Sequence, residues 1–178
     1  MSSAPSLSSY GKEEFTAGLD GTTFGAITPI IRSRMNENAA QIDFGVPVCK
    51  GSTKDEHGRL CVKPLDSNSD VVIGISLRES IVGAADPSTG LIGFLQYKEV
   101  PFLGGPGIVR ATPFEAVEDG DQVIAVVGGT GSKLSGSKSG VVGTGRIIVT
   151  NMFWDGARAA GVQGVIRSVD MQAPVATT

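Results

Sequence analysis

Short apolar runs, each of strand length and separated by turn-forming residues, constrain the fold of this chain more than any other feature. Some alternate apolar with polar residues, others are apolar throughout, and several are rich in Val and Ile. Runs of this length and composition predict β-strands. The expected strands cover residues 27–34, 44–49, 60–62, 71–77, 93–100, 107–111, 122–127, 146–150 and 162–169.

The glycine content supports the same interpretation. Glycine makes up 25 of the 178 residues, and such a share favours tight turns over long helices. Only residues 79–85 and 154–160 could form a helical turn or two, while residues 84–90 and 128–140 predict long exposed loops. No internal repeat is evident. We therefore expect an all-β protein, with residues 29–170 folded as one small β-barrel or β-sandwich.

The first 28 residues differ from this core in composition. Ser, Gly, Thr and Ala dominate, and large apolar side chains stand singly at Tyr10, Phe15, Leu19 and Phe24. Such a segment buries too little apolar surface to order itself. Residues 1–28 therefore predict an extended N-terminal arm, or, as the alternative, an ordinary disordered terminus. Residues 171–178 are expected to form a short C-terminal tail.

The overall charge gives no indication of a nucleic-acid or membrane partner. The formal net charge is −3 and the isoelectric point is near 5.1, so the chain has no general attraction to nucleic acid or anionic lipid. No apolar stretch approaches the roughly 18 residues that span a bilayer, and the N-terminus lacks the pattern of a signal peptide. We therefore expect folding in a reducing cytoplasm, with Cys49 and Cys61 as thiols rather than a disulfide.

Several short motifs suggest chemistry, and each fails on its context. Residues 128–133 are glycine-rich and follow an apolar run, but they lack the spacing of a phosphate-binding loop. Residues 66–70 begin like a calcium-binding loop, yet Val71 and Leu77 stand where such a loop needs Gly and Glu. The only histidine, His57, lies in a polar, turn-like stretch, which predicts a solvated side chain rather than a catalytic base. We expect no catalytic residue, no cofactor and no metal.

Two other functions stay open at this point. Residues 17–20, Ala-Gly-Leu-Asp, are similar to a signature of the dUTPases, which are small all-β enzymes, but the other motifs of that family have no counterpart here. A virion-surface module that binds carbohydrate is the second alternative, with Trp154 as its only candidate for stacking on a sugar. One group of carboxylates belongs mostly to a turn, which argues against an acid–base pair. Its members are Glu115, Glu118, Asp119 and Asp121.

Four short segments of the expected core follow one another in a recognisable order. Phe-Gly-Val-Pro-Val at residues 44–48 precedes the apolar run Val-Val-Ile-Gly-Ile-Ser-Leu at 71–77. The turn and strand Ala-Val-Glu-Asp-Gly-Asp-Gln-Val follow at 116–123, and Gly-Val-Ile-Arg comes near the end at 164–167. In this order the segments resemble the structural cement proteins of tailed phages, which are small decoration subunits of capsids.

The resemblance covers about residues 27–170 and implies a role without catalysis. It implies the major capsid protein as partner, the outer capsid surface of the virion as location, and noncovalent contacts across the seams of the shell as mechanism. A symmetric shell favours a symmetric homo-oligomer, here a trimer, with a dimer as the alternative. The arm, residues 128–140 and the residues beyond Asp170 depart from the family pattern. Fully extended, the arm would reach roughly 90–100 Å. Its expected anchors on the shell are Tyr10, Phe15, Leu19 and Phe24.

Overall fold

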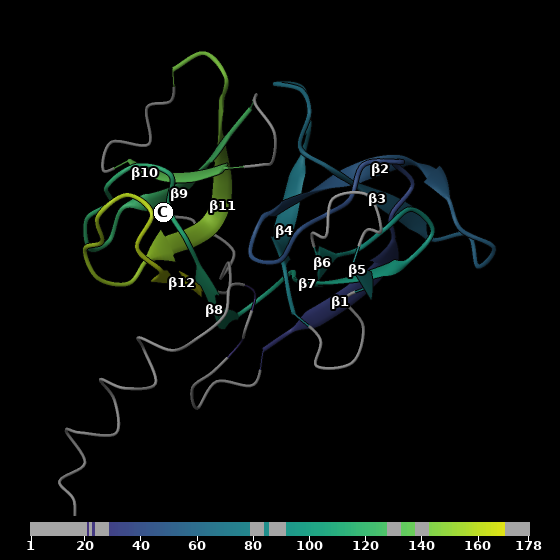
Figure 1. Ribbon diagram of the computed structural model, residues 1–178, viewed down its shortest axis with the longest axis horizontal. Helices are drawn as coiled ribbons and strands as arrows, with labels where there is room; N and C mark the ends of the chain where they lie inside the picture. Colours follow the sequence, from purple (N-terminus) through teal and green to yellow (C-terminus); the bar gives the residue numbers. More distant parts are fainter. Residues whose placement is uncertain are drawn as a thin grey trace, which may run out of the picture.

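The computed structural model describes residues 21, 23, 29–78, 84–85, 92–127, 133–137 and 143–169. Within these residues the chain is all-β, as predicted, with two five-stranded antiparallel sheets, one two-stranded sheet and no helix (Figure 1). The strands are β1 (Ile31–Met35), β2 (Pro47–Lys54), β3 (Leu60–Pro64), β4 (Val72–Ser76), β5 (Ala84–Ala85), β6 (Ile92–Gly93), β7 (Glu99–Leu103), β8 (Gly107–Ala111), β9 (Gln122–Val126), β10 (Lys133–Ser137), β11 (Arg146–Trp154) and β12 (Gly164–Ser168).

The N-terminal sheet has the strand order β1-β7-β4-β2-β3, and its two edge strands meet. Asn36 directly follows β1 and pairs in parallel with Val62 of β3, while the N–H of Glu37 donates to the carbonyl oxygen of Val62 at 2.9 Å. Because β1 and β3 are the two ends of the strand order, this bridge curls the sheet into a small barrel. The buried Asn36 side chain donates to the carbonyl oxygens of Ala40 and Phe94 and so fixes the closing segment.

The C-terminal sheet repeats this topology with β8 to β12. Its strand order, read from β8, is β8-β12-β11-β9-β10. In both sheets the order is therefore the first, fifth, fourth, second and third strand of that sheet along the chain. It also closes in the same way, because Pro113, shortly after β8, pairs in parallel with Leu134 of β10. The expectation that the chain has no internal repeat is wrong at the level of the fold. The chain contains two small barrels of one topology in succession (Figure 1).

Equivalent positions in the two barrels make equivalent hydrogen bonds. Before β2, the N–H of Gly45 donates to the carbonyl oxygen of Ser76, and the N–H of Ser76 donates to the carbonyl of the residue after the glycine. Before β9, Gly120 and its successor make the same two bonds with Trp154. Gly45 and Gly120 have φ angles of 71° and 77°, a conformation that glycine adopts without steric cost. The same turn therefore begins the second strand of each barrel.

Two apolar clusters lie on opposite faces of the N-terminal sheet. One lies within the N-terminal barrel and comprises Ile42, Val48, Val62, Phe94, Val100 and Phe102. The other joins Cys49 and Leu103 of the N-terminal sheet to residues of the C-terminal barrel around Trp154. Val48 and Cys49 are neighbours in β2 but belong to different clusters, since successive strand residues point to opposite faces. The N-terminal sheet is therefore buried on both faces, and the second cluster holds the barrels together.

Gly21 also links the two barrels, although it lies within the predicted arm. Its N–H donates to the carbonyl oxygen of Arg110 in β8 at 2.8 Å, and its carbonyl accepts from the N–H of Arg78, after β4, at 2.9 Å. Its φ is +79°, and a Cβ here would lie 2.8 Å from the backbone nitrogen of Arg78, so only glycine fits. Thr23 pairs with Val109 of β8. These two residues of the predicted arm thus belong to the packed structure.

Three local expectations are wrong. β10 lies inside the predicted loop 128–140, where it pairs with β9 along its whole length. The short β5 lies in the predicted loop 84–90 and pairs with β6. Residues 154–160 do not form a helical turn, because Trp154 ends β11 and Arg158 pairs with Val117. In each case backbone pairing with another segment of the chain decides the conformation.

Candidate functional site: a groove between the barrels

A groove of about 340 Å³ lies between the barrels, where β4 and β11 run side by side (Figure 1). Its walls come from both sheets and from the connection between them. The lining residues are 72–74 of β4, 104–105 between β7 and β8, 149–152 of β11, and 168–169 at the end of β12. The groove thus marks the seam at which the chain passes from one barrel to the other.

On one wall, the first residues of β4 are not paired with β7. It pairs with β7 only from Ile75 onward, so residues 72–74 have no register partner on that side within the described residues. The two glycines that follow β7, at 104–105, place no side chain in the opening. A Cβ on the second of them would lie 2.9 Å from the Cβ of Ile30, so glycine fits here best. Beside these small residues Val72 and Ile73 are partly exposed, while Gly74 is buried.

On the opposite wall, β11 departs from regular pairing. Its register with β9 shifts between Ile148 and Phe153, and within the described residues 149–151 belong to the register of neither β9 nor β12. Asn151 has a φ of 64°, the left-handed region that asparagine tolerates, and its carbonyl accepts from the N–H of Val169 at 3.0 Å. The groove therefore lies between the start of β4, which pairs with β2 alone, and an irregular, bulged stretch of β11.

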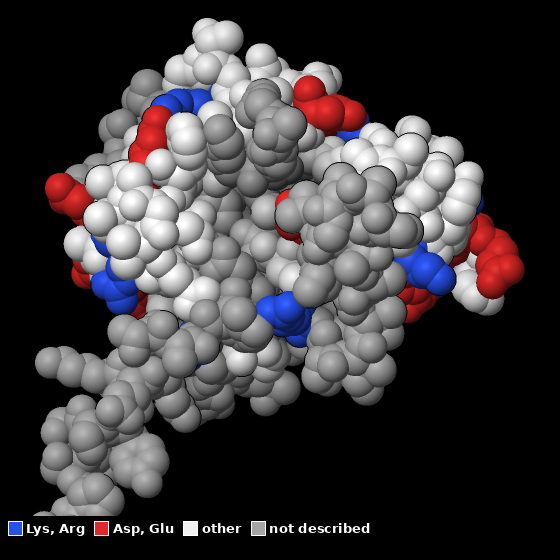
Figure 2. All heavy atoms as spheres, viewed as in Figure 1, with Lys and Arg blue, Asp and Glu red and all other residues white. Residues whose placement is uncertain are grey.

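The groove is uncharged. Among the described residues that line it, every side chain is apolar, absent or neutral and polar. Apolar side chains are exposed at its border, namely Val169 at 40% and Ile30, beside Gly105, at 49%. Among the described residues on the face seen in Figure 2, acidic and basic side chains lie interspersed.

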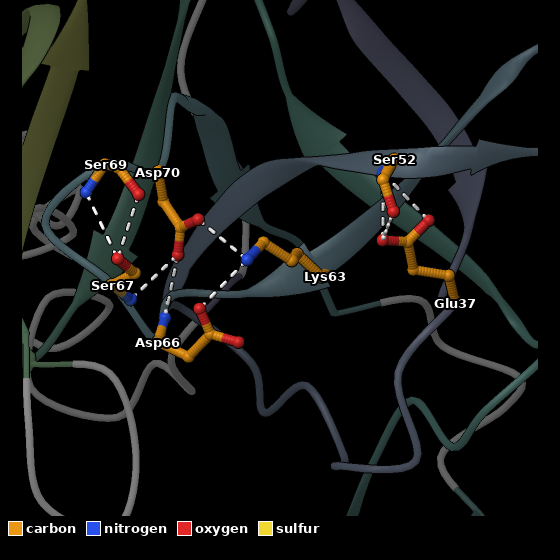
Figure 3. Close-up of polar contacts among 7 residues, drawn as sticks. All are labelled: Glu37, Ser52, Lys63, Asp66, Ser67, Ser69 and Asp70. Atoms are coloured by element: carbon orange, nitrogen blue, oxygen red, sulfur yellow. Dashed lines mark hydrogen bonds and ion pairs between the residues drawn. The ribbon is translucent and has the colours of Figure 1, made fainter.

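The loop at residues 66–70, which begins like a calcium site, holds a lysine ammonium group instead (Figure 3). The Nζ of Lys63 lies 2.9 Å from Oδ1 of Asp66 and 2.7 Å from Oδ1 of Asp70. The other oxygen of Asp70 accepts from the backbone N–H groups of residues 66 and 67. Burial raises the pKa of Asp70, but the hydrogen bonds from Lys63 and these N–H groups outweigh it and lower the pKa to about 2. The loop is a structural ion-pair network.

Glu37 has a comparable structural role at an irregularity of β2 (Figure 3). The register of β2 with β3 shifts between Lys50 and Lys54, and the Glu37 carboxylate accepts from the N–H groups of Ser52 and Thr53 inside this shift, at 2.7 to 3.0 Å. It also accepts from the Thr53 hydroxyl at 2.6 Å. Burial raises the pKa of Glu37, but these hydrogen bonds outweigh it and hold the pKa below its ordinary value. The carboxylate satisfies strand amides that the sheet leaves unpaired.

The carboxylates near residue 118 are also engaged in structural bonds. Glu115 accepts from Arg146 at 2.6 and 2.8 Å and from the Ser135 hydroxyl at 2.6 Å, and these hydrogen bonds lower the pKa of Glu115. Asp119 and Asp121 each accept from a backbone N–H group of a nearby turn. These groups hold turns and strands together and do not form an acid–base pair.

His57 is solvated, as predicted. Its side chain lies in the turn between β2 and β3, is 66% exposed and has Glu56 as its neighbour at 3.5 Å. A second cavity of about 340 Å³ adjoins it, with Arg59 and the exposed Tyr97 in its wall. Arg59 is already paired with carboxylates on both sides of the cavity. Nothing in this cavity places a nucleophile beside the histidine.

The structure contradicts the proposed role of Trp154 in sugar binding. The indole is fully buried, and its Nε1–H donates to the carbonyl oxygen of Ser135 at 2.9 Å. A buried ring has no free face on which a sugar could stack, so the carbohydrate alternative loses the residue on which it rested. Cys49 and Cys61 are free thiols, as predicted, and both are buried. Burial, with the nearby carboxylates, raises the pKa of the Cys49 thiol to about 12.

The expected anchors, and residues 17–20 of the dUTPase-like motif, lie outside the described residues. These anchors are Tyr10, Phe15, Leu19 and Phe24. The groove was not predicted from the sequence, because it depends on where β4 stops pairing with β7 and where the register of β11 with β9 shifts. The one sequence signal that could have indicated it is the glycine pair at 104–105, directly after a strand.

The described residues form two joined β-barrels, and the carboxylates of Asp70, Glu37 and Glu115 are used in structural bonds. Within the described residues no group of His, Cys, Asp and Glu could hold a metal ion, and no helix there is long and apolar enough to cross a membrane. The sequence matches the family described as structural cement protein (E217 gp24/Pam3 gp6) over residues 7–168. The chain belongs to this family of phage structural proteins, and it is not an enzyme.

Comparison with solved structures agrees on the fold. A chain from the structure titled "The capsid of Myoviridae Phage XM1" is similar with a TM-score of 0.58, over 85% of this chain and 89% of that chain. The two sequences are 19% identical, so this likeness concerns the fold. A comparison with curated proteins gave no match.

Proposed function

We propose that the protein binds the outer surface of the assembled phage head and stabilises the seams between major capsid protein subunits by noncovalent contacts. The family match over residues 7–168 carries this proposal. The fold similarity to a chain of the phage XM1 capsid supports it. Contact surface is what such a role requires, and both the apolar border of the groove and the interspersed surface charges can supply it.

We further propose that attachment is multivalent. A homotrimer is favoured, with a dimer as the alternative, because a symmetric oligomer on a symmetric shell converts modest affinity per site into strong binding. The N-terminal arm adds anchors to each subunit, and an apolar side chain buried against the shell contributes about 1–2 kcal/mol. The proposed anchors are Tyr10, Phe15, Leu19 and Phe24.

Binding to undecorated capsids tests the proposal. The full chain is compared with a variant that lacks residues 1–20 and keeps Gly21, because Gly21 bonds to both barrels. Capsids are mixed with each protein at matched concentration and sedimented, and the occupancy is measured. We expect the full chain to bind and the shortened chain to bind about tenfold more weakly or worse.

The two parts of the proposal fail separately. A full chain that does not bind capsids at any accessible concentration contradicts the function itself. Equal occupancy by both proteins would mean that the arm supplies no anchor and that the barrels carry the binding.

A further inference from the structure

We propose that the N-terminal arm of the free subunit folds back and adds an antiparallel strand to the edge of β1, with Glu14 opposite Arg34 and Phe15 opposite Ser33. Residues 1–20 lie outside the described residues, so the proposal rests on the edge that they would cover and on their sequence. It goes beyond the function proposed above and does not depend on it, because it concerns the subunit without a shell.

The backbone of β1, an edge strand of the N-terminal sheet, carries the first step (Figure 1). Asn36, directly after β1, donates its N–H to the carbonyl oxygen of Lys98 on the side of β7. Because alternate residues of a strand bond to the same side, the backbone groups of Ile31 and Ser33 point away from β7. No strand pairs with them there within the described residues, since the bridge from Asn36 to Val62 lies beyond them. Such an edge is completed by another extended chain.

The charges of β1 favour an acidic partner strand. Arg32 and Arg34 lie two residues apart, on one face of the strand, and neither forms an ion pair within the described residues. Nη1 of Arg34 donates to the carbonyl oxygen of Ser33 at 3.0 Å, which places this guanidinium beside the open edge. A second copy of β1, paired about Ser33, would set Arg32 opposite Arg34, and like charges in direct opposition destabilise a strand pair. A carboxylate opposite Arg34 would form an ion pair instead.

The sequence of the arm complements both faces of β1. Glu14 and Phe15 are neighbours, so they fall on opposite faces of an extended strand. When Glu14 faces the Arg34 guanidinium, Phe15 lies on the face of Ile31, which is 48% exposed and lies within diagonal reach of an aromatic ring. Glu13 falls on the face of Phe15 and has no guanidinium opposite it.

The arm of the same chain is long enough to reach this edge. Gly21 accepts a backbone bond from the residue after Leu77, and Leu77 donates to the carbonyl oxygen of Pro101 in β7, which lies opposite Ser33 of β1. At about 4.8 Å per strand, the open edge of β1 is therefore about 15 Å from this point. The six residues from Phe15 to Gly21 span up to about 20 Å when extended. A short tether gives an effective concentration of about 1 mM, which favours the chain's own arm over the arm of a second copy.

An arm in this position protects the free subunit. An unpaired strand edge is a template for pairing with other chains, and the docked arm covers it. Phe15 is also a proposed anchor on the shell, so the arm would leave β1 when the subunit attaches.

Amide hydrogen exchange, measured by NMR on the isolated protein, gives the first test. We expect the N–H groups of Ile31 and Ser33 to exchange at least tenfold more slowly in the full chain than in a variant without residues 1–20. The N–H groups of Arg32 and Arg34 face β7 and should be slow in both proteins, so they are the internal control. Equal exchange of Ile31 and Ser33 in the two proteins, with the control amides slow, would overturn the proposal.

Charge reversals in the full chain give the second test, which does not require the shortened protein to fold. Glu14→Arg should speed exchange at Ile31 and Ser33 at least tenfold, and its combination with Arg34→Glu should restore the slow exchange. Glu13→Arg is the matched control, because it makes the same charge change on the other face of the arm. Fast exchange in both single variants, or in neither, would overturn the pairing.

A cysteine pair identifies the chain that supplies the arm. Phe15→Cys together with Ser33→Cys should form a disulfide within one chain under mild oxidation, detected as a monomer on a non-reducing gel and by mass spectrometry of the linked peptides. Cys49 and Cys61 are buried and do not compete. A disulfide-linked dimer would assign the arm to a second copy and overturn the proposal. No capsid takes part in these tests, so their results are independent of the capsid-binding result.

Discussion

The ammonium group of Lys63 lies 2.7 Å from Oδ1 of Asp70, and the second Asp70 oxygen accepts two backbone N–H bonds from the same loop. The Asp70 side chain is only 7% exposed, so this carboxylate is held as an anion in a largely buried position. Removing its charge would leave the Lys63 ammonium group with Asp66 as its remaining ionic partner. The connection between β3 and β4 therefore depends on one ionisation state.

Acid should weaken the protein through Asp70. The folded-state pKa is lowered from 3.8 to about 2, so its contribution is fully present above about pH 4 and is lost as the pH falls from there through 2. We expect Asp70→Asn to remove up to about 2 kcal/mol of the stability difference between pH 5 and pH 2. Urea unfolding at several pH values measures it, with the exposed Asp155→Asn as control. An unchanged acid dependence in Asp70→Asn would contradict the assignment.

Gly21→Ala should destabilise the whole molecule, because it combines an unfavourable φ with a contact to Arg78 and strains the link between the barrels. We expect a loss of about 1–3 kcal/mol in the free energy of unfolding. Gly58→Ala is a matched control, since Gly58 has a similar φ of +74° with nothing within 4 Å of the added Cβ. Urea unfolding of both variants separates the contact from the backbone cost; equal losses would mean that the contact with Arg78 is unimportant.

The single tryptophan provides a direct optical test of its burial. Trp154 should emit at short wavelength in the native protein, shift to longer wavelength on unfolding, and not respond to added sugars. Trp154→Phe should lose about 2–4 kcal/mol of stability, because it removes packing and leaves the Ser135 carbonyl unpaired. Chemical denaturation followed by circular dichroism measures this. A native emission spectrum typical of a solvated indole would show that the ring is exposed.

Glu37→Gln should loosen β2 locally. The amide keeps one acceptor oxygen where the carboxylate offers two, so the N–H groups of Ser52 and Thr53 lose part of their bonding. We expect faster hydrogen exchange at these two amides and a loss of about 1 kcal/mol in stability. Ser52→Ala serves as control, because it removes one hydroxyl and keeps both N–H bonds. Unchanged exchange at residues 52 and 53 would disprove the role of the carboxylate.

The sequence predicted the strands that carry their own apolar pattern. The run at 107–111 coincides with β8, and the runs at 71–77 and 122–127 contain β4 and β9 with small differences at their ends. β10 was not predicted as a strand, because its sequence Lys-Leu-Ser-Gly-Ser contains only one large apolar residue. Its strand character comes from its partners: Leu134 is buried, and the buried Ser135 bonds to Glu115 and Trp154.

The repeated topology was not predicted from the sequence for a related reason. Ser76 and Trp154 make the same backbone bonds in the two barrels, yet their side chains have nothing in common, because one bonds to a neighbouring loop and the other fills a core. Backbone geometry is shared where side-chain identity is not. The groove is also a property of registers, and a single sequence does not state where the pairing between distant strands ends.

The order of the two barrels along the chain has a consequence for synthesis on the ribosome. Every member of the cluster inside the N-terminal barrel lies between Ile42 and Phe102, so that barrel can close before β8 to β12 have been translated. Its opposite face, with Cys49, Ile75 and Leu103, then stays uncovered until the C-terminal barrel arrives. The nascent chain therefore passes through a stage in which this apolar surface is exposed to solvent. The time needed to translate the C-terminal barrel sets how long the surface can associate with other proteins.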